Sequence, residues 1–399
     1  MSFKTGHVDL SDSIFSADDL AKARVYLSSL ITKVDSSWTK KPKGPLGEHW
    51  NSDSPYAACF LIDTAFVLNL FERRISPRSA PIFLPKVKGI LEPNSQKEFI
   101  ENLTEFQMGF VLAQYVSPLD VDPLGPDEFL LPLTHHQRPK TPDFAVQLPD
   151  TKVFFEVTVL HVQILDDWDK GVDDITIALK HHLCKQQKDL TVHIQFPLPF
   201  PRITNQMIKH LLRRIDASAS GREIFSSGGE IRWELLPAIN APDISSVFSA
   251  FFNTSSPIAV FSTSGGNEGL GRAFAQQRNV ATMPEADRTE ANRRLFNSLC
   301  NTLDRKKEQL AHAKPALFVL KLRHHWLLED ELITKIQERI WPNPQYDWMT
   351  GIVLFTPRQG FSRSDAEHRI TLWLNPKARC QASNALISLF STRSQFHFR

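Results

Sequence analysis

The sequence predicts an α/β protein in which a mixed central sheet is flanked by helices, with an N-terminal helical unit and an inserted α+β subdomain. Three observations support this prediction. Residues 1–92 carry apolar side chains at helical spacing, strand-like and helix-like segments alternate after residue 140, and 42% of the 399 residues are hydrophobic. That is enough apolar material for a large core, and the length suggests two or three structural units.

The N-terminal unit, residues 1–92, is expected to be helical. Ser16 is a plausible N-cap, with Asp19 three residues later, before the periodic stretch "LAKARVYLSSLITKV". "KKPKGPLGEHW" is interpreted as a linker. "YAACFLIDTAFVLNLF" predicts a buried helix, because it is charged at Asp63 and shorter than the ~20 residues of a membrane span. The proline-containing stretch "RRISPRSAPIFLPKVKGILEPN" predicts a loop that ends this unit.

A core is predicted in residues 93–162 and 289–399. It comprises a helix at "QKEFIENLTEFQMGFVLAQYV", a hairpin, a long helix that runs into the strand "PALFVLKL", an amphipathic helix, and the strands "TGIVLFT" and "HRITLWLNP". Residues 163–288 form the predicted subdomain, with strands at "LTVHIQF", "GEIRWELL" and "SPIAVFS" and a helix at "TNQMIKHLLRRIDAS". "AVFSTSGGNEGLGRAF" predicts a strand and a glycine-rich turn, with a following helix as one interpretation and a mobile loop as the preferred one.

Bulk charge selects no partner, because the formal net charge is only +2. Basic residues gather locally in residues 202–222 and 293–323, which suits contacts to phosphates or, as the simpler alternative, solvated helix faces. The four cysteines form no CxxC pair, and the N-terminus lacks a basic segment followed by an apolar one. We therefore expect free thiols, a cytoplasmic location and no membrane partner.

The hairpin "KTPDFAVQLPDTKVFFEVTVL" carries two acids in an apolar setting. A tight turn at residues 150–151 would pair Leu148 with Val153 and Asp143 with Thr158. Asp143, Glu156 and Thr158 would then share one face, with the two acids ~7 Å apart as diagonal neighbours. Two carboxylates at this spacing can bind one hard divalent cation, which polarises a phosphodiester and lowers the pKa of an attacking water.

Pro142–Asp143, followed by Glu156–Val157–Thr158 in a hydrophobic strand, resembles the PD-(D/E)xK nuclease superfamily, which has the restriction-endonuclease-like fold. The resemblance implies a metal-dependent nuclease, a phosphodiester hydrolase acting on DNA. It implies Mg²⁺ or Mn²⁺ as the cofactor, bound by Asp143, Glu156 and an acid of the preceding helix, for which Glu105 is preferred over Glu101. Many nucleases of this kind act as homodimers.

The departure from the family pattern is Thr158, which stands where a lysine is expected. The resemblance then implies a lysine from a following helix. We prefer Lys306, with Gln309 one helical turn away, because this helix runs directly into an apolar strand. The other options are Lys307, Lys180 and Lys185.

Two alternatives remain open at this point. The loss of the motif lysine favours a catalytically inactive nuclease-like fold that serves as a nucleic-acid or protein binding module. The other alternative is an α/β protein of unrelated function in which the hairpin acids are merely exposed.

Overall fold

The computed structural model describes residues 8, 10, 13–52, 55–116, 118–121, 141–162, 174, 178, 182, 190–195, 204–224, 230–237, 258–262, 272–275, 285–310, 314–322, 329–357 and 368–391. It is a mixed α/β structure with a six-stranded mixed sheet flanked by helices. The chain divides into two compact units. Unit 1 comprises Met1–Leu160, Cys300–Arg323 and Ile333–Arg399, and unit 2 comprises His161–Leu299 and His324–Leu332.

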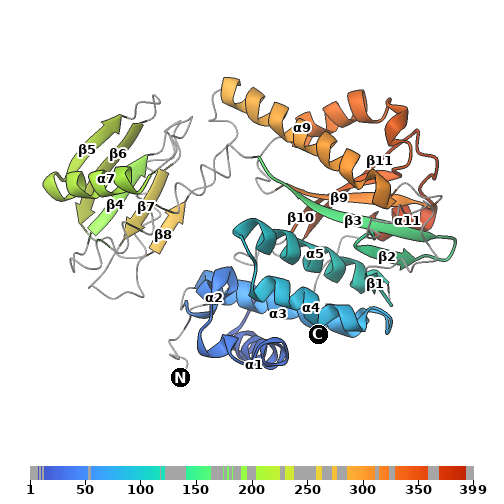
Figure 1. Ribbon diagram of the computed structural model, residues 1–399, viewed down its shortest axis with the longest axis horizontal. Coiled ribbons are helices and arrows are strands. Elements are labelled where there is room, and N and C mark those ends of the chain that lie inside the picture. Colours follow the sequence, from blue (N-terminus) through green and yellow to red (C-terminus); the bar gives the residue numbers. More distant parts are fainter. Residues whose placement is uncertain are drawn as a thin grey trace, which may run out of the picture. The chain divides into compact units, whose positions relative to one another are not determined.

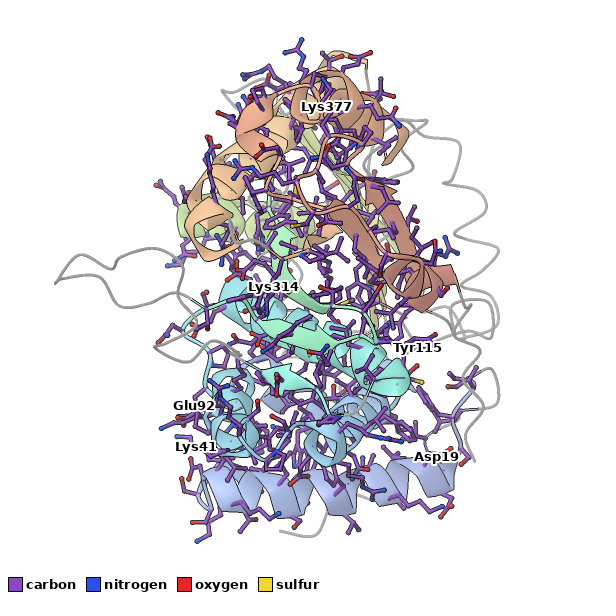
Figure 2. All side chains as sticks on the ribbon, turned by 90° about the vertical axis from the view of Figure 1, so that its right-hand side faces the viewer. Asp19, Lys41, Glu92, Tyr115, Lys314 and Lys377 are labelled. Carbon is purple, nitrogen blue, oxygen red and sulfur yellow. The ribbon has the colours of Figure 1, made fainter. Side chains whose placement is uncertain are left out.

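The N-terminal part of unit 1 is helical. Its elements are α1 (Ala17–Val34), the 3₁₀ turn η1 (Trp38–Lys40), α2 (Gly44–Trp50), α3 (Pro55–Arg74), α4 (Ala80–Leu91) and α5 (Gln96–Tyr115). α1 begins at a capping box in which the Ser16 N–H donates to the Asp19 carboxylate at 2.8 Å. The predicted buried helix is α3, which packs between α1 and α5. Lys41 lies at the outer edge of these helices (Figure 2).

Helix α4 corrects the prediction of a loop between residues 73 and 94. Pro81 stands in its first turn, where a helix needs no N–H donor, and Pro85 lies inside it. The side chains of Phe83, Val87 and Ile90 are buried at helical spacing. Their burial outweighs the hydrogen bond that Pro85 removes, since each fully buried side chain of this kind contributes about 1.5–3 kcal/mol.

The sheet of unit 1 has the strand order β1-β2-β3-β9-β10-β11. The strands are β1 (Asp120–Val121), β2 (Phe144–Gln147), β3 (Lys152–Leu160), β9 (Ala316–Leu322), β10 (Gly351–Thr356) and β11 (Arg369–Leu374). β9 runs parallel to both β3 and β10, and the other pairs are antiparallel. β9 and β10 are buried on both faces, as central parallel strands usually are. Helix α5 lies on one side of the sheet and α9 (Glu285–Leu310) on the other (Figure 1).

The hairpin register differs by two residues from the predicted one. Val153 pairs with Val146 instead of Leu148, and the Leu148 N–H closes the loop by donating to the Thr151 carbonyl at 2.8 Å. The predicted tight turn would have put Pro149, which has no N–H, in the ladder pair next to the turn. A shift of two preserves the face of each side chain.

The core of unit 1 fills the layer between the N-terminal helices and the sheet. The Phe71 ring lies 5.0 Å from that of Phe106 and 6.1 Å from that of Phe144, both edge-on. Gly109 of α5 leaves room for these rings, because a Cβ there would lie 2.2 Å from Phe71 and 3.0 Å from Phe144. The glycine therefore lets α5 approach the start of β2 closely.

The C-terminal part of unit 1 completes the sheet. Its helical segments are α10 (Glu329–Lys335), which begins in unit 2, the π-helical turn η5 (Ile336–Ile340), the 3₁₀ turn η6 (Pro344–Tyr346) and α11 (Asn384–Ser391). Asn375, after β11, is buried, and its amide donates to the carbonyls of Tyr346 and Met349 at 3.2 and 3.0 Å. This asparagine fixes the connection between η6 and the end of β11.

Unit 2 holds an antiparallel sheet with the order β5-β6-β4-β7-β8. Its elements are β4 (Leu190–Gln195), α7 (Asn205–Ala217), β5 (Ser220–Ile224), β6 (Glu230–Pro237), β7 (Ile258–Ser262) and β8 (Arg272–Ala275). The helix predicted after the glycine-rich stretch is wrong, because Arg272–Ala275 form a strand whose backbone pairs with β7. Within the described ranges, no helix is long and apolar enough to cross a membrane.

Candidate active site

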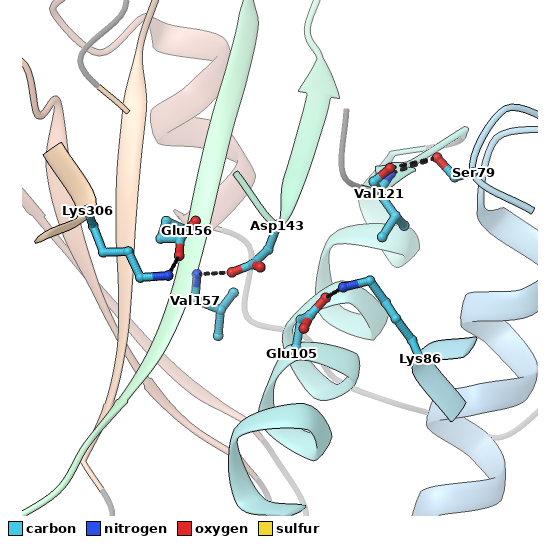
Figure 3. Close-up of polar contacts among 8 residues, drawn as sticks. All are labelled: Ser79, Lys86, Glu105, Val121, Asp143, Glu156, Val157 and Lys306. Carbon is cyan, nitrogen blue, oxygen red and sulfur yellow. Dashed lines mark hydrogen bonds and ion pairs between the residues drawn. The ribbon is translucent and has the colours of Figure 1, made fainter. Parts of the chain in front are cut away.

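The candidate site lies where β3 extends beyond β2. The last paired residues are Phe144 and Phe155, so Asp143, the next residue, lies level with Glu156. The Val157 N–H donates to Asp143 Oδ2 at 2.7 Å (Figure 3). The carboxylate thus accepts the hydrogen bond that a continued β2 backbone would otherwise take, which fixes Asp143 beside the middle of β3.

Glu156 is the most deeply buried acid of the site. Its side chain is 0% exposed, and Oε1 accepts a hydrogen bond from Lys306 Nζ of α9 (Figure 3). The side chain of Lys306 is 31% exposed, so the ion pair joins a buried anion to a cation that still touches solvent. Glu156 Oε2 is buried and has no hydrogen-bond partner within the described part of the chain. Such an oxygen is costly to desolvate unless a cation or a proton balances it.

A second ion pair joins Glu105 of α5 to Lys86 Nζ of α4 on the other side of β3 (Figure 3). The two side chains are 18% and 20% exposed. Lys86 was not among the predicted site residues, because the segment that carries it was interpreted as a loop. The apolar spacing of Phe83, Val87 and Ile90 was the signal that could have revealed the helix that carries it.

The carboxylates of the site have raised pKa values. Burial raises the pKa of Asp143, and the nearby Glu156 raises it further, against the opposing effects of Lys86, the Val157 N–H and Lys306. Burial also raises the pKa of Glu156, although Lys306 opposes the shift. Burial lowers the pKa of Lys306, but the Glu156 carboxylate more than compensates, and the net shift is upward. The lysine therefore stays charged, while the acid pair favours a bound proton or cation.

A cavity of about 500 Å³ opens beside this cluster. Its walls come from α5, β3 and α9, and it is lined by Lys97, Glu101, Asn102, Glu105, Val157, Thr158, Val159, Thr302, Arg305 and Lys306. Thr158 and Lys306 thus face the same space, although they are far apart in sequence. The Thr158 side chain is shorter than a lysine and leaves room in this part of the cavity.

The remaining predicted residues are not brought to the cluster by anything the structure describes. The backbone of Gln309 belongs to α9, but its side chain lies outside the described part of the structure. Lys180 and Lys185 lie outside the described residues altogether. Lys307 is exposed and does not line the cavity. Glu101 lines it and pairs with Lys97 at 3.9 Å.

The donor set at the acid pair suits a hard divalent cation. Within the described residues, no three His, Cys, Asp or Glu side chains form a group that could hold a metal ion. However, Mg²⁺ commonly uses only one or two carboxylates and completes its coordination with water and substrate phosphates. Asp143 and the unpaired Oε2 of Glu156 meet that smaller requirement.

Comparisons with models of known families, with curated proteins and with solved structures found no match to this chain. The function is therefore inferred from the geometry of the site.

Proposed function

We propose that this chain is a Mg²⁺- or Mn²⁺-dependent phosphodiesterase acting on DNA, with a restriction-endonuclease-like core in unit 1. One observation carries the proposal: Lys306 Nζ meets the buried Glu156 carboxylate beside Asp143. The order of elements supports it, because the acid-bearing α5 precedes the β2–β3 hairpin and α9 leads into the apolar strand β9. These are the positions that the resemblance implies for the acids and for a displaced lysine.

Each residue then has a distinct role. Asp143 and Glu156 would hold the cation, and Glu105 would be an auxiliary acid that Lys86 positions. When bound, the cation supplies a Lewis acid and lowers the pKa of a coordinated water. The Lys306 ammonium stabilises negative charge that develops on the phosphate. Thr158 leaves space beside Lys306, and Gln309 follows one helical turn later on α9.

Cleavage of plasmid and oligonucleotide DNA with Mg²⁺ or Mn²⁺ tests the proposal. We expect Asp143→Asn and Glu156→Gln each to lower the cleavage rate by at least about 100-fold, the usual effect of removing a group that stabilises transition-state charge. Asp18→Asn is the matched control, because Asp18 is an exposed acid of α1 that pairs only with Lys22 at 2.6 Å in the described structure. Equal cleavage by all three variants and the natural chain would rule the assignment out.

A second candidate function follows from the same contact. Because Lys306 already neutralises Glu156, and Thr158 replaces the motif lysine, the pair also suits a nuclease-like fold that binds DNA without cleaving it. This candidate predicts DNA binding that needs no divalent cation and survives Glu156→Gln. It also predicts that Mn²⁺ leaves the melting temperature unchanged, whereas the nuclease proposal predicts an increase.

A further inference from the structure

The charged side chains that line the cavity are paired, with one exception. Glu105 pairs with Lys86, Lys97 with Glu101 at 3.9 Å, and Lys306 with Glu156. The exception is Arg305, which has no carboxylate partner among the described residues.

Among the described residues, the Arg305 guanidinium is hydrogen-bonded by groups of its own helix. Its Nε donates to the Asn301 carbonyl and one terminal nitrogen donates to Thr302 Oγ1, both at 3.3 Å. No carboxylate pairs with it in the described part of the chain. The cavity therefore has a positive group with further hydrogen-bond donors, directly adjacent in sequence to Lys306.

The chemistry of this group favours a phosphate. A guanidinium presents donors in a rigid fork that matches two phosphate oxygens, and its charge cannot be titrated away. Asn102 and Thr302 in the same wall offer neutral hydrogen-bonding groups. The Asn102 amide nitrogen already donates to the Gly89 carbonyl at 3.0 Å, and this contact joins α5 to α4.

The size of the cavity limits the form of the ligand. A volume of about 500 Å³ lies within the range of small-ligand pockets and is large enough for one nucleotide unit. A DNA duplex, whose major groove alone is about 12 Å wide, does not fit inside such a space. A single strand can enter it one nucleotide at a time.

We propose that the cavity is a single-strand subsite in which Arg305 binds the phosphate next to the one held at the Asp143–Glu156 cluster. The inference rests on the proposed function for the identity of that neighbouring phosphate. Arg305 is thus a substrate-positioning residue, and the preferred substrate is a single-stranded nucleic acid or a frayed end.

Binding of a labelled single-stranded DNA oligonucleotide in EDTA, followed by fluorescence anisotropy, tests this subsite. We expect Arg305→Gln to weaken binding by about 10-fold, since a charge-assisted hydrogen bond contributes about 1.5 kcal/mol. The slope of log affinity against log salt should fall by about 0.7, the value for one phosphate contact in a single strand. The affinity of Arg305→Lys should lie between those of the natural chain and Arg305→Gln. Lysine keeps the positive charge but lacks the planar guanidinium that can bind two phosphate oxygens.

Lys307→Gln is the matched control. It removes the same charge from the same helix at an exposed position that does not line the cavity. The affinity of Lys307→Gln for the oligonucleotide should stay within about twofold of that of the natural chain, as expected for the loss of one exposed charge. Equal losses for Arg305→Gln and Lys307→Gln, or tighter binding of a blunt duplex than of the single strand, would overturn the proposal. Circular dichroism checks folding, and Arg305→Lys carries the test if Arg305→Gln does not fold.

The two proposals fail in different ways. If Arg305→Gln loses affinity while the natural chain never cleaves DNA, the subsite stands and the nuclease assignment falls. If Arg305→Gln binds like the natural chain while cleavage still requires Asp143 and a divalent cation, the subsite falls and the nuclease assignment stands.

Discussion

The two lysine–glutamate pairs of the site differ in what surrounds the acid. Lys306 reaches Glu156, which is 0% exposed and has a second oxygen without a partner. Lys86 reaches Glu105, which is 18% exposed and lines the cavity. Removal of Lys306 would leave the Glu156 carboxylate buried without a counter-charge. Removal of Lys86 would leave the Glu105 carboxylate, which solvent can reach through the cavity. Loss of the lysine should therefore destabilise the fold strongly at the Lys306–Glu156 pair and only weakly at the Lys86–Glu105 pair.

The largest expected difference between the two pairs is in activity. On the proposed mechanism, Lys306→Met should lower metal-dependent DNA cleavage by at least about 100-fold, because it removes the ammonium that would stabilise charge on the phosphate. Lys86→Met should lower it by less than about 10-fold, since Glu105 is retained and only its position is loosened. Single-turnover cleavage rates at saturating Mg²⁺ measure both. Equal losses would show that the two lysines act as one unit.

Moving the lysine from position 306 to position 158 tests whether the Lys306 charge itself is what cleavage requires. Thr158 and Lys306 line one cavity, so Thr158→Lys in the Lys306→Met background places an ammonium in the same space. We expect part of the lost cleavage to return, on the order of 10-fold, because the charge is restored without its original geometry. Thr158→Met in that background is the control of similar length. Equal rates for the two double variants would contradict a migrated lysine.

The free energy of unfolding should also fall more for Lys306→Met than for Lys86→Met. Lys306→Met should lower the free energy of unfolding by about 3 kcal/mol at pH 8, because it leaves the buried Glu156 without its partner. Adding Glu156→Gln should recover most of that loss, and a double-mutant cycle by urea denaturation measures the coupling. Lys86→Met should cost about 1 kcal/mol. Simple additivity of Lys306→Met and Glu156→Gln would show that the pair does not interact in solution.

The pH dependence of stability should identify the acid pair. Burial raises the folded-state pKa of Asp143 to about 8 and that of Glu156 to about 7. The folded state then holds more protons than the unfolded state above pH 4, so its stability falls as pH rises from about 5 to 8. Asp143→Asn with Glu156→Gln should remove this decline, on the order of 1 kcal/mol per pH unit. Parallel pH profiles for the natural chain and the double variant would contradict the shifts.

Metal binding should show the smallest of these effects and the opposite trend with pH. Protons compete with a divalent cation for carboxylates of raised pKa, so Mn²⁺ should raise the melting temperature more at pH 8 than at pH 6. A gain of about 2–4 °C is expected at saturating Mn²⁺, equivalent to about 1 kcal/mol for a large domain. Glu156→Gln should abolish it, and Asp18→Asn should not.

Local patterns were sufficient to predict several elements of the fold. The apolar stripe of α5 and the continuous run of β9 are each encoded by neighbouring residues, and both elements are present. The approach of Lys306 to Glu156 was predicted from a resemblance and from the strand that follows α9. The contact is present, and the catalytic roles of the two residues stay predictions.

Other features depended on tertiary context. The hairpin register follows from the missing N–H of Pro149, which single-strand periodicity does not detect. Helix α4 forms in a proline-containing stretch because its apolar side is buried, and Lys86 was overlooked with it. Arg305 lies in a basic run, and its position in the wall of the cavity distinguishes it from Lys307, which sequence alone does not reveal.

The separation of Glu156 and Lys306 by 150 positions has a consequence for biosynthesis. A nascent chain leaves the ribosome from its N-terminus, so β3 is available long before α9 has been translated. Until then Glu156 has neither its lysine nor the neighbouring strand β9, and the apolar edge of β3 is exposed. This edge stays unpaired with β9 while unit 2 is being made. A truncated chain that ends before residue 300 should therefore aggregate.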